Sequence, residues 1–490
     1  MSETRQEPKR SPLRKPRRGD RLEVEIESLD GKGRCVGTGM SLDVPESGSW
    51  VVSLRGGVPG ERVRADVIRR RGNRVEARIT ETLRVSPQAV EPRCAHFGTC
   101  GGCSFQNLDY ARQGEFQRAS VEKLFAAQGL LEHARVEPVV LCREPWNYRN
   151  KMEFTYGNRR WVEADEPEGV SADFALGLHV PGRWDKVLHV ESCAIQSETA
   201  NAILTSLREL ALEQGLEPWD VRNHTGLLRH AVLRVADSTG ESMLNLVTSE
   251  EAREAIDGYV GALLQRHPEL TTVVQNINSR AASVAIGERE IVLHGSGVIR
   301  EEIDGLSFLI SAASFFQTNS RQAAELFRIV REEAACEADD HVFDVYCGTG
   351  SLTLNLARDA RHVVGFEVVE EAVVDARRNA ESNGLANVEF IAGDVITTIA
   401  EHLEDGKSPD RIVVDPPRAG IHPKVLERLA SLGTRRFVYV SCNPASAARD
   451  VQVLCESGYR LTRVRPVDLF PHTPHIETVL TLDLVEDASC

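Results

Sequence analysis

The spacing of hydrophobic and polar positions changes along the chain. Between residues 20 and 84, glycines separate short runs that alternate apolar and polar residues: Leu22–Ile26, Trp50–Leu54, Arg62–Ile68 and Arg74–Ile79. Alternation with period two indicates strands that bury one face, and closely spaced strands with glycine turns are typical of a small closed β-barrel. We therefore predict a barrel domain over residues 19–84.

A mixed region follows and extends to residue 305, where we place a central α+β domain over residues 85–305. It opens with a helical pattern near Asp109–Gln128 and contains strand patterns such as Lys151–Tyr156 and Thr271–Gln275. Trp146–Lys151 and Leu228–Arg234 alternate cations with aromatic or apolar side chains. Such runs can stack bases and pair with phosphates, although a strand with one wet face has the same pattern.

From residue 306 strand patterns alternate with helical ones. The strand patterns are His341–Tyr346, Arg361–Glu367, Val388–Ile391, Arg411–Asp415, Arg436–Val440, Leu461–Val464 and Thr478–Leu482. Alternation of this kind predicts an α/β domain with a mostly parallel, doubly wound sheet.

Several of these strand patterns lead into residues that could bind a nucleoside cofactor. The glycines of the loop 347–351 allow close approach of a backbone, Glu367 is spaced to bind ribose hydroxyls, and Asp394 could accept a hydrogen bond from an adenine amino group. The sequence lacks an intact G-x-G-x-x-G, so S-adenosylmethionine fits better than a dinucleotide. Taken singly, either carboxylate could equally be a turn residue.

A thiol and two carboxylates border the last strands. Cys442 ends one apolar run, Glu477 precedes another, and Asp415 ends the strand before them. Because the carboxyl ends of parallel strands open onto one crevice, we expect these groups to converge. An inert buried cysteine is the alternative for Cys442, but a place beside a cofactor crevice favours a reactive, accessible thiol.

Three cysteines lie close together in Cys94-Ala-His-Phe-Gly-Thr-Cys100-Gly-Gly-Cys103. The Gly-Gly pair lets the backbone fold tightly, and a cytosolic chain would not use such thiols for structural disulfides. We predict a metal or cluster site, with Cys142 or Cys193 as the fourth ligand. Spacing alone allows an iron–sulfur cluster or zinc, because both take four thiolates.

Composition adds little to these patterns. The chain has 490 residues, 41% of them hydrophobic and 27% charged, which suits about two to four globular domains. We see no membrane-spanning stretch or signal peptide and expect a cytoplasmic protein. The net charge of −15 argues weakly against nucleic acid, but basic residues cluster at 5–18, in a tail of residues 1–18, and again at 69–78. Such clusters could contact phosphates or simply be solvated.

Five motifs make the chain resemble the RNA uracil-5-methyltransferase family: Phe315-Phe-Gln-Thr-Asn, Asp344-Val-Tyr-Cys-Gly-Thr-Gly, Asp415-Pro-Pro-Arg, Ser441-Cys-Asn-Pro and Phe470-Pro-His-Thr-Pro-His-Ile-Glu. The cysteine motif is similar to the ribosomal RNA branch of that family. The resemblance implies a TRAM-type barrel, a [4Fe–4S] cluster and a class I methyltransferase domain over residues 306–490. Transfer RNA members are expected to lack the barrel and the cluster.

The resemblance also implies roles for single residues. The implied cluster ligands are Cys94, Cys100, Cys103 and Cys193. The implied cofactor contacts are Gln317, Tyr346, Ser351, Glu367, Asp394 and Asp415. The implied nucleophile is Cys442 and the implied base is Glu477. Some relatives carry Asn at the position of Ser351, and the helix near 106–137 is expected to pack on the catalytic domain.

The expected activity is methylation of carbon 5 of a uridine in RNA, with 23S ribosomal RNA as the substrate and no membrane or protein partner. Attack of the Cys442 thiolate on carbon 6 would make carbon 5 electron-rich, and Glu477 would remove the remaining proton. Alternatives are a transfer RNA uridine methyltransferase, an RNA cytosine-5-methyltransferase, a radical S-adenosylmethionine enzyme and a non-enzymatic iron–sulfur RNA-binding module. The cytosine enzyme usually has a second cysteine where this chain has Asp415-Pro-Pro.

Overall fold

A computed structural model describes residues 14–163, 166–282, 284–404 and 408–485, which form two compact units. The first unit comprises the chain up to Arg93 together with Cys103–Phe116 and His472–Pro474. The second comprises Cys94–Gly102, Gln117–Pro471 and the chain from His475 onward. Most of the predicted tail of residues 1–18 lies outside the described residues. No helix within the described ranges is long and apolar enough to cross a membrane.

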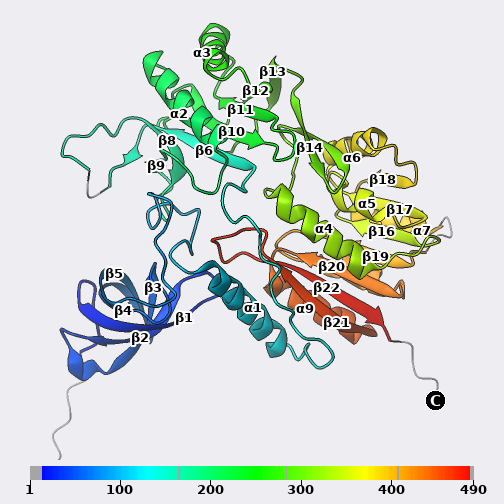
Figure 1. Cartoon of the computed structure of the whole chain (residues 1–490), viewed down its shortest axis with the longest axis horizontal. Coiled ribbons are helices and arrows are strands. Elements are labelled where there is room, and N and C mark those ends of the chain that lie inside the picture. The colour runs from blue at the N-terminus through cyan, green and yellow to red at the C-terminus, as the bar shows by residue number, and fades with distance from the viewer. Residues whose placement is uncertain (1–13, 164–165, 283, 405–407, 486–490) are drawn as a thin grey trace, which may run out of the picture. The chain divides into compact units, whose positions relative to one another are not determined.

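The first unit contains a closed five-stranded barrel in the order β1-β2-β3-β5-β4, which confirms the barrel prediction (Figure 1). Its strands are β1 (Arg21–Leu29), β2 (Cys35–Ser41), β3 (Ser49–Arg55), β4 (Arg62–Arg71) and β5 (Arg74–Arg84), with a 3-10 turn at Pro45–Ser47. The sequence did not predict β2, because its glycines hide the alternation. One of them is required: a Cβ on Gly37 would lie 1.9 Å from the carbonyl oxygen of Glu25 on β1.

The second unit begins with an eight-stranded mixed sheet in the order β13-β12-β11-β10-β6-β8-β9-β7. Its strands are β6 (Lys151–Gly157), β7 (Arg160–Trp161), β8 (Ala175–His179), β9 (Val187–His189), β10 (Leu228–Val235), β11 (Ser242–Thr248), β12 (Thr272–Ile277) and β13 (Arg289–His294). Two helices, α2 (Glu198–Glu213) and α3 (Arg253–Arg266), share a core with one face of this sheet. Alternate residues of β6, β10 and β11 therefore point away from that core.

A seven-stranded sheet follows in the order β18-β17-β16-β19-β20-β22-β21, with β22 antiparallel to both of its neighbours (Figure 1). Its strands are β16 (His341–Val345), β17 (His362–Glu367), β18 (Val388–Ala392), β19 (Arg411–Val414), β20 (Arg436–Ser441), β21 (Tyr459–Val467) and β22 (Glu477–Leu484). The helices are α4 (Ser320–Ala334), α5 (Ser351–Leu356), α6 (Glu370–Ser382), α7 (Val395–Glu404), α8 (Pro423–Ala430) and α9 (Pro444–Glu456). A hairpin of β14 (Val298–Ile303) and β15 (Leu306–Ser311) precedes them. The doubly wound prediction is confirmed.

The segment before β6 covers one edge of the seven-stranded sheet. The C-terminal half of α1 (Tyr110–Ala127) buries Val121 and Phe125 in the same core as Leu480 of β22. Farther along, the N–H groups of Glu137 and Val140 donate to β21 carbonyls at 2.9 Å each. Edge strand β21 is thus paired within the second unit rather than left open to other chains.

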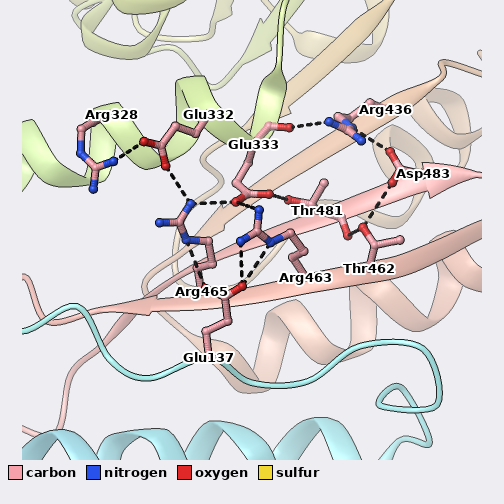
Figure 2. Close-up of polar contacts among 10 residues, drawn as sticks. All are labelled: Glu137, Arg328, Glu332, Glu333, Arg436, Thr462, Arg463, Arg465, Thr481 and Asp483. Carbon is pink, nitrogen blue, oxygen red and sulfur yellow. Dashed lines mark hydrogen bonds and ion pairs between the residues drawn. The ribbon is translucent and has the colours of Figure 1, made fainter.

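A network of ion pairs fixes the same edge (Figure 2). Glu333 on α4 has a side chain only 2% exposed and accepts hydrogen bonds from Arg465 at 2.8 Å and Thr481 at 2.7 Å. Arg463 lies 3.0 Å from the same carboxylate and 2.9 Å from Glu137. A buried carboxylate surrounded by donors in this way is satisfied, so the network locks α4, β21, β22 and the segment at Glu137 together.

Candidate active site

The titratable residues of the candidate site lie at the carboxyl ends of neighbouring parallel strands. Asp344 is the fourth residue of β16, Glu367 ends β17, Asp415 follows β19 and Cys442 follows β20. Strand β16 pairs in parallel with β17 and β19, and β19 pairs in parallel with β20. The structure therefore brings together, at one edge of one sheet, the groups that the sequence placed there.

Backbone conformation shapes the turn after β16. Tyr346, Gly348 and Gly350 have positive φ angles of 67°, 54° and 82°, and a Cβ on Gly350 would lie 2.9 Å from an aromatic ring. Glu367 closes the turn, because its carboxylate accepts the Gly348 N–H at 3.1 Å and a second backbone N–H at 2.9 Å. A ligand can thus approach bare backbone next to a carboxylate of fixed orientation.

The other predicted cofactor residues are held differently. Asp394 is exposed, and its carboxylate accepts the N–H groups of Ile396 at 3.1 Å and Thr397 at 3.2 Å, so it also caps the start of α7. Ser351 is the first residue of α5, at the end of the glycine turn. Gln317 is half-buried, and its backbone carbonyl accepts a hydrogen bond from Asn150 at 2.9 Å. For Asp394 the turn-residue interpretation is therefore correct, and a cofactor contact would be an additional role.

Three carboxyl groups at these strand ends have little to neutralise them. Asp344 accepts a hydrogen bond from Thr353 at 2.6 Å, while its other oxygen is buried without a partner among the described residues. Burial raises the pKa of Asp344 to about 7. Burial, and then the charge of Asp344, raises the pKa of Asp415 to about 7. Burial, and then the charge of Asp415, raises the pKa of Glu477 well above its usual range.

Cys442 lies opposite Glu477 across two antiparallel strands. Ser441 of β20 pairs with Thr478 of β22 in antiparallel register. Cys442, which follows Ser441, therefore faces Glu477, which precedes Thr478. Burial, followed by the charges of Glu477 and Asp415, raises the pKa of Cys442 to about 11. The resting site therefore holds a neutral thiol next to carboxyl groups that readily keep their protons.

Arg418 is a cation of this site that sequence reasoning did not assign. Its charge lowers the pKa of Cys442 and of Glu477, although burial outweighs that effect at both groups. The guanidinium lies 2.8 Å from the Nδ1 atom of His475, and the Arg418 carbonyl accepts a hydrogen bond from Asn443 at 2.8 Å. Arg418 stands in the Asp415-Pro-Pro-Arg motif and His475 in the Phe470–Glu477 motif, so the signal for both was present in the sequence.

Three of the four predicted cluster ligands interact with one another in the second unit. Burial, together with smaller contributions from the neighbouring Cys193 and Cys94, raises the pKa of Cys100 to about 11. Cys103 is half-buried and belongs to the first unit, and Cys142 donates to a backbone carbonyl at 3.3 Å. Within the described ranges, no group of three or more His, Cys, Asp or Glu side chains is arranged to hold a metal ion. Buried thiols suit a cluster in kind, but this is not the geometry of a formed metal site.

Comparison with known proteins gives consistent matches. Residues 299–485 match the family described as tRNA (uracil-5-)-methyltransferase. An uncharacterized RNA methyltransferase of Chlorobaculum tepidum is 40% identical over 478 residues, 96% of this chain and 98% of that protein. Another, from Porphyromonas gingivalis, is 38% identical and covers 94% of this chain and 99% of its own length. The chain belongs to the RNA uracil-5-methyltransferase family, as its motifs predicted.

A solved structure matches almost the whole fold. The Pyrococcus abyssi tRNA (uracil-54, C5)-methyltransferase, in complex with S-adenosyl-L-homocysteine, superposes with a TM-score of 0.71 at 29% identity, covering 95% of this chain and 100% of that one. The likeness confirms the methyltransferase fold. About one twentieth of this chain lies outside the match, which is fewer residues than the barrel contains (Arg21–Arg84). The match to this transfer RNA enzyme therefore includes at least part of the barrel region.

Proposed function

We propose that the protein methylates carbon 5 of a uridine in RNA, with S-adenosylmethionine as the methyl donor and Cys442 as a covalent catalyst. The observation that carries the proposal is the strand register that sets Cys442 opposite Glu477. The solved relative from P. abyssi was bound to S-adenosyl-L-homocysteine, which is the product of that donor. We infer a cytoplasmic protein, because its RNA substrates are there.

The glycine turn and its neighbours would bind the cofactor. The bare backbone from Tyr346 to Ser351 offers room, Glu367 would accept the ribose hydroxyls, and Asp394 would accept the adenine amino group while still capping α7. Gln317 and Asp415 are the remaining residues that the family resemblance assigns to cofactor binding. When bound, S-adenosylmethionine supplies a methyl group on a positively charged sulfur, and a cation favours ionised carboxylates around it.

Cys442 would start the reaction. Its sulfur bonds to carbon 6 of uracil, the electrons of the carbon 5–carbon 6 double bond move into the enolate, and carbon 5 becomes nucleophilic toward the methyl group. The thiol must first lose its proton. Two features of the site favour the thiolate: the Arg418 charge, and the N-terminus of α9, which begins two residues after Cys442. The Arg418 charge and the α9 N-terminus would act together with ionised carboxylates, which can accept the proton of the Cys442 thiol.

Glu477 would finish the reaction. After methyl transfer, carbon 5 carries both the new methyl group and its original proton. A carboxylate whose pKa is raised by burial is a stronger base than an exposed one. Glu477 takes the proton, the double bond reforms, and the sulfur of Cys442 leaves carbon 6 as a thiolate. Atoms and charge then balance, with methylated RNA and the demethylated cofactor as products.

We further propose that Cys94, Cys100, Cys103 and Cys193 hold a [4Fe–4S] cluster that orders RNA-binding segments and takes no part in methyl transfer. Support comes from the mutual influence of Cys94, Cys100 and Cys193 and from the resemblance of their motif to that of the ribosomal RNA branch. Anaerobically purified protein should contain about four iron and four sulfide per chain. Cys100→Ser should lose both, whereas the spare thiol variant Cys142→Ser should retain them.

The substrate is proposed to be 23S ribosomal RNA, on the resemblance of the cysteine motif. A second candidate is transfer RNA, because the solved relative acts on transfer RNA and matches the barrel region in part. Mapping 5-methyluridine in both RNA classes, in cells with and without the gene, separates the two. Loss of the modified base from 23S RNA alone supports the first candidate, and loss from transfer RNA alone supports the second.

Trapping with 5-fluorouridine RNA tests the proposal directly, because fluorine at carbon 5 cannot be removed as a proton and the adduct persists. We expect a complex stable to denaturing electrophoresis with the wild type and none with Cys442→Ala. Cys455→Ala, which removes another half-buried thiol at the far end of α9, is the matched control and should trap normally. A complex that still forms with Cys442→Ala would refute the covalent mechanism.

A further inference from the structure

A cavity of about 840 Å³ opens on the eight-stranded sheet, on the face that points away from α2 and α3. Lys151, Glu153 and Thr155 of β6 line it, together with His230 of β10 and Asn245 of β11. The residues between them along these strands belong to the core beneath the helices. The volume falls within the range of about 300–1,000 Å³ that is common for ligand sites.

The walls of this cavity combine apolar surface with hydrogen-bonding groups. Trp184 is 67% exposed and Ile286 is 62% exposed, although both line the cavity. The Nδ1 atom of His179, another lining residue, is buried without a partner among the described residues. A large exposed aromatic ring next to a few polar groups is the surface on which unstacked nucleobases bind.

A cluster of arginines gathers around Asp185, which follows the lining residue Trp184 in the chain. Arg159, Arg183 and Arg222 surround the carboxylate of Asp185, at 2.9, 3.5 and 2.7 Å. Three cations on one acid leave a local charge of about +2 in a chain whose net charge is −15. Asp185 is buried and holds the guanidinium groups in place, which makes the cluster a preformed site for phosphate.

The cavity is connected to the segment that carries Gln317. Ala312 and Ala313 line the cavity and lie just before that segment. Asn150, next to the lining residue Lys151, donates to the Gln317 carbonyl at 2.9 Å and to Ser320 at 2.8 Å. A ligand in the cavity would therefore contact Lys151 and Ala313, which are close in the chain to Asn150 and Gln317.

We propose that this cavity binds a nucleotide of the RNA substrate other than the uridine that is methylated. Its base enters the cavity and stacks on Trp184, and its phosphate contacts the arginine cluster around Asp185. The inference rests on the proposed function for the identity of the polymer, but the binding it describes needs neither Cys442 nor a methyl donor. Its effect is to anchor the RNA strand while another base occupies the methylation site.

Binding of a 15-nucleotide oligouridylate in the absence of methyl donor tests the proposal. We expect Trp184→Ala to weaken binding roughly tenfold and Trp184→Phe to keep most of the affinity, because a ring still stacks. Arg222→Gln should weaken binding and lower the slope of log affinity against log salt by about 0.7, the value for one lost phosphate contact on a single strand. The matched control is Arg253→Gln, which removes an exposed arginine on α3 and should change neither quantity.

Turnover on total RNA from cells that lack the gene provides a second measurement. Trp184→Ala and Arg222→Gln should raise KM for RNA by the same factor as Kd and leave kcat within about twofold, because the reacting atoms are untouched. Wild-type affinity and KM in both variants, with unchanged thermal unfolding, would overturn the cavity proposal. If the wild type binds RNA through the cavity but forms no 5-methyluridine, the proposed function fails and the binding site stands.

Discussion

Two buried carboxylates of the second unit, Glu333 and Glu477, have almost the same exposure and opposite surroundings. Glu333 is 2% exposed and Glu477 is 4% exposed. Arg463, Arg465 and Thr481 surround Glu333, as Figure 2 shows. Among the described residues Glu477 forms no ion pair. Of the charged side chains, Asp415 raises its pKa most strongly, and Arg418 lowers it by less.

The difference separates a structural role from a chemical one. A buried charge that the protein itself neutralises contributes fixed geometry, and removing one partner leaves the others unpaired. A buried carboxyl without a counter-charge keeps its proton until a ligand or substrate supplies the compensation, which makes it a candidate acid or base. Glu333 belongs to the first kind, whereas Glu477, Asp415 and Asp344 belong to the second.

The largest expected effect is on turnover, from Glu477→Gln. Gln has nearly the same shape but cannot take the carbon 5 proton, so kcat should fall by about 10²- to 10⁴-fold. Methylated RNA should remain bonded to Cys442. Single turnover with a radiolabelled methyl donor, followed by denaturing electrophoresis, measures both quantities. Free methylated RNA at the wild-type rate would contradict the role of Glu477 as the base.

Glu333→Gln should act on stability and leave the chemistry unchanged. Arg465 is 13% exposed and would lose a charged partner, so we expect the free energy of unfolding to fall by about 3 kcal/mol. Trapping of 5-fluorouridine RNA at low temperature should be normal. Glu332→Gln removes the neighbouring acid, which is 45% exposed, and should cost at most about 1 kcal/mol in urea unfolding. An equal loss of unfolding free energy in the two variants would show that the burial of Glu333 does not increase its contribution to stability.

The unpaired carboxyls should make stability depend on pH. An unfolded carboxyl has a pKa near 3.9, while Asp344 in the folded protein has a pKa of about 7. Between about pH 4 and 7 the folded state retains a proton that the unfolded chain has lost. The free energy of unfolding therefore falls as pH rises, by about 1.4 kcal/mol per unit for each such group, and the full stabilisation is present only below about pH 4.

Asp344→Asn isolates this contribution, because an amide oxygen can still accept the hydrogen bond from Thr353. Urea unfolding of the wild type and the variant at several pH values from 4 to 8 gives the measurement. The free energy of unfolding of the wild type, relative to that of Asp344→Asn, should fall as pH rises from about 4 to 7. A constant difference would mean that Asp344 is ionised throughout.

The smallest expected effect concerns Asp394, which the structure assigns to the cap of α7. Asp394→Ser keeps a capping oxygen but has a shorter reach. If Asp394 also accepts the adenine amino group, affinity for S-adenosylmethionine should fall about fivefold, the worth of one net hydrogen bond, with thermal unfolding unchanged. If calorimetry shows unaltered affinity for S-adenosylmethionine, the role of Asp394 is limited to capping α7.

Most of the fold could be predicted from the sequence, because its strands are apolar runs with clear ends. Each strand pattern of the doubly wound sheet corresponds to a strand of the structure, from His341–Val345 to Glu477–Leu484. Strand β2 was missed because glycines replace its alternating side chains. The cavity was also missed, since its lining comes from separate strands and loops and no continuous pattern marks it.

The sequence by itself determined the elements and the inventory of reactive groups, because periodicity and strand-end motifs are local properties. Only the tertiary structure decided which groups meet. Antiparallel β22, inserted between β20 and β21, puts Glu477 opposite Cys442. Arg463 and Arg465 reach Glu333 from a strand far along the chain. Whether an acid is paired or left to titrate depends on desolvation and on neighbours that only folding brings close.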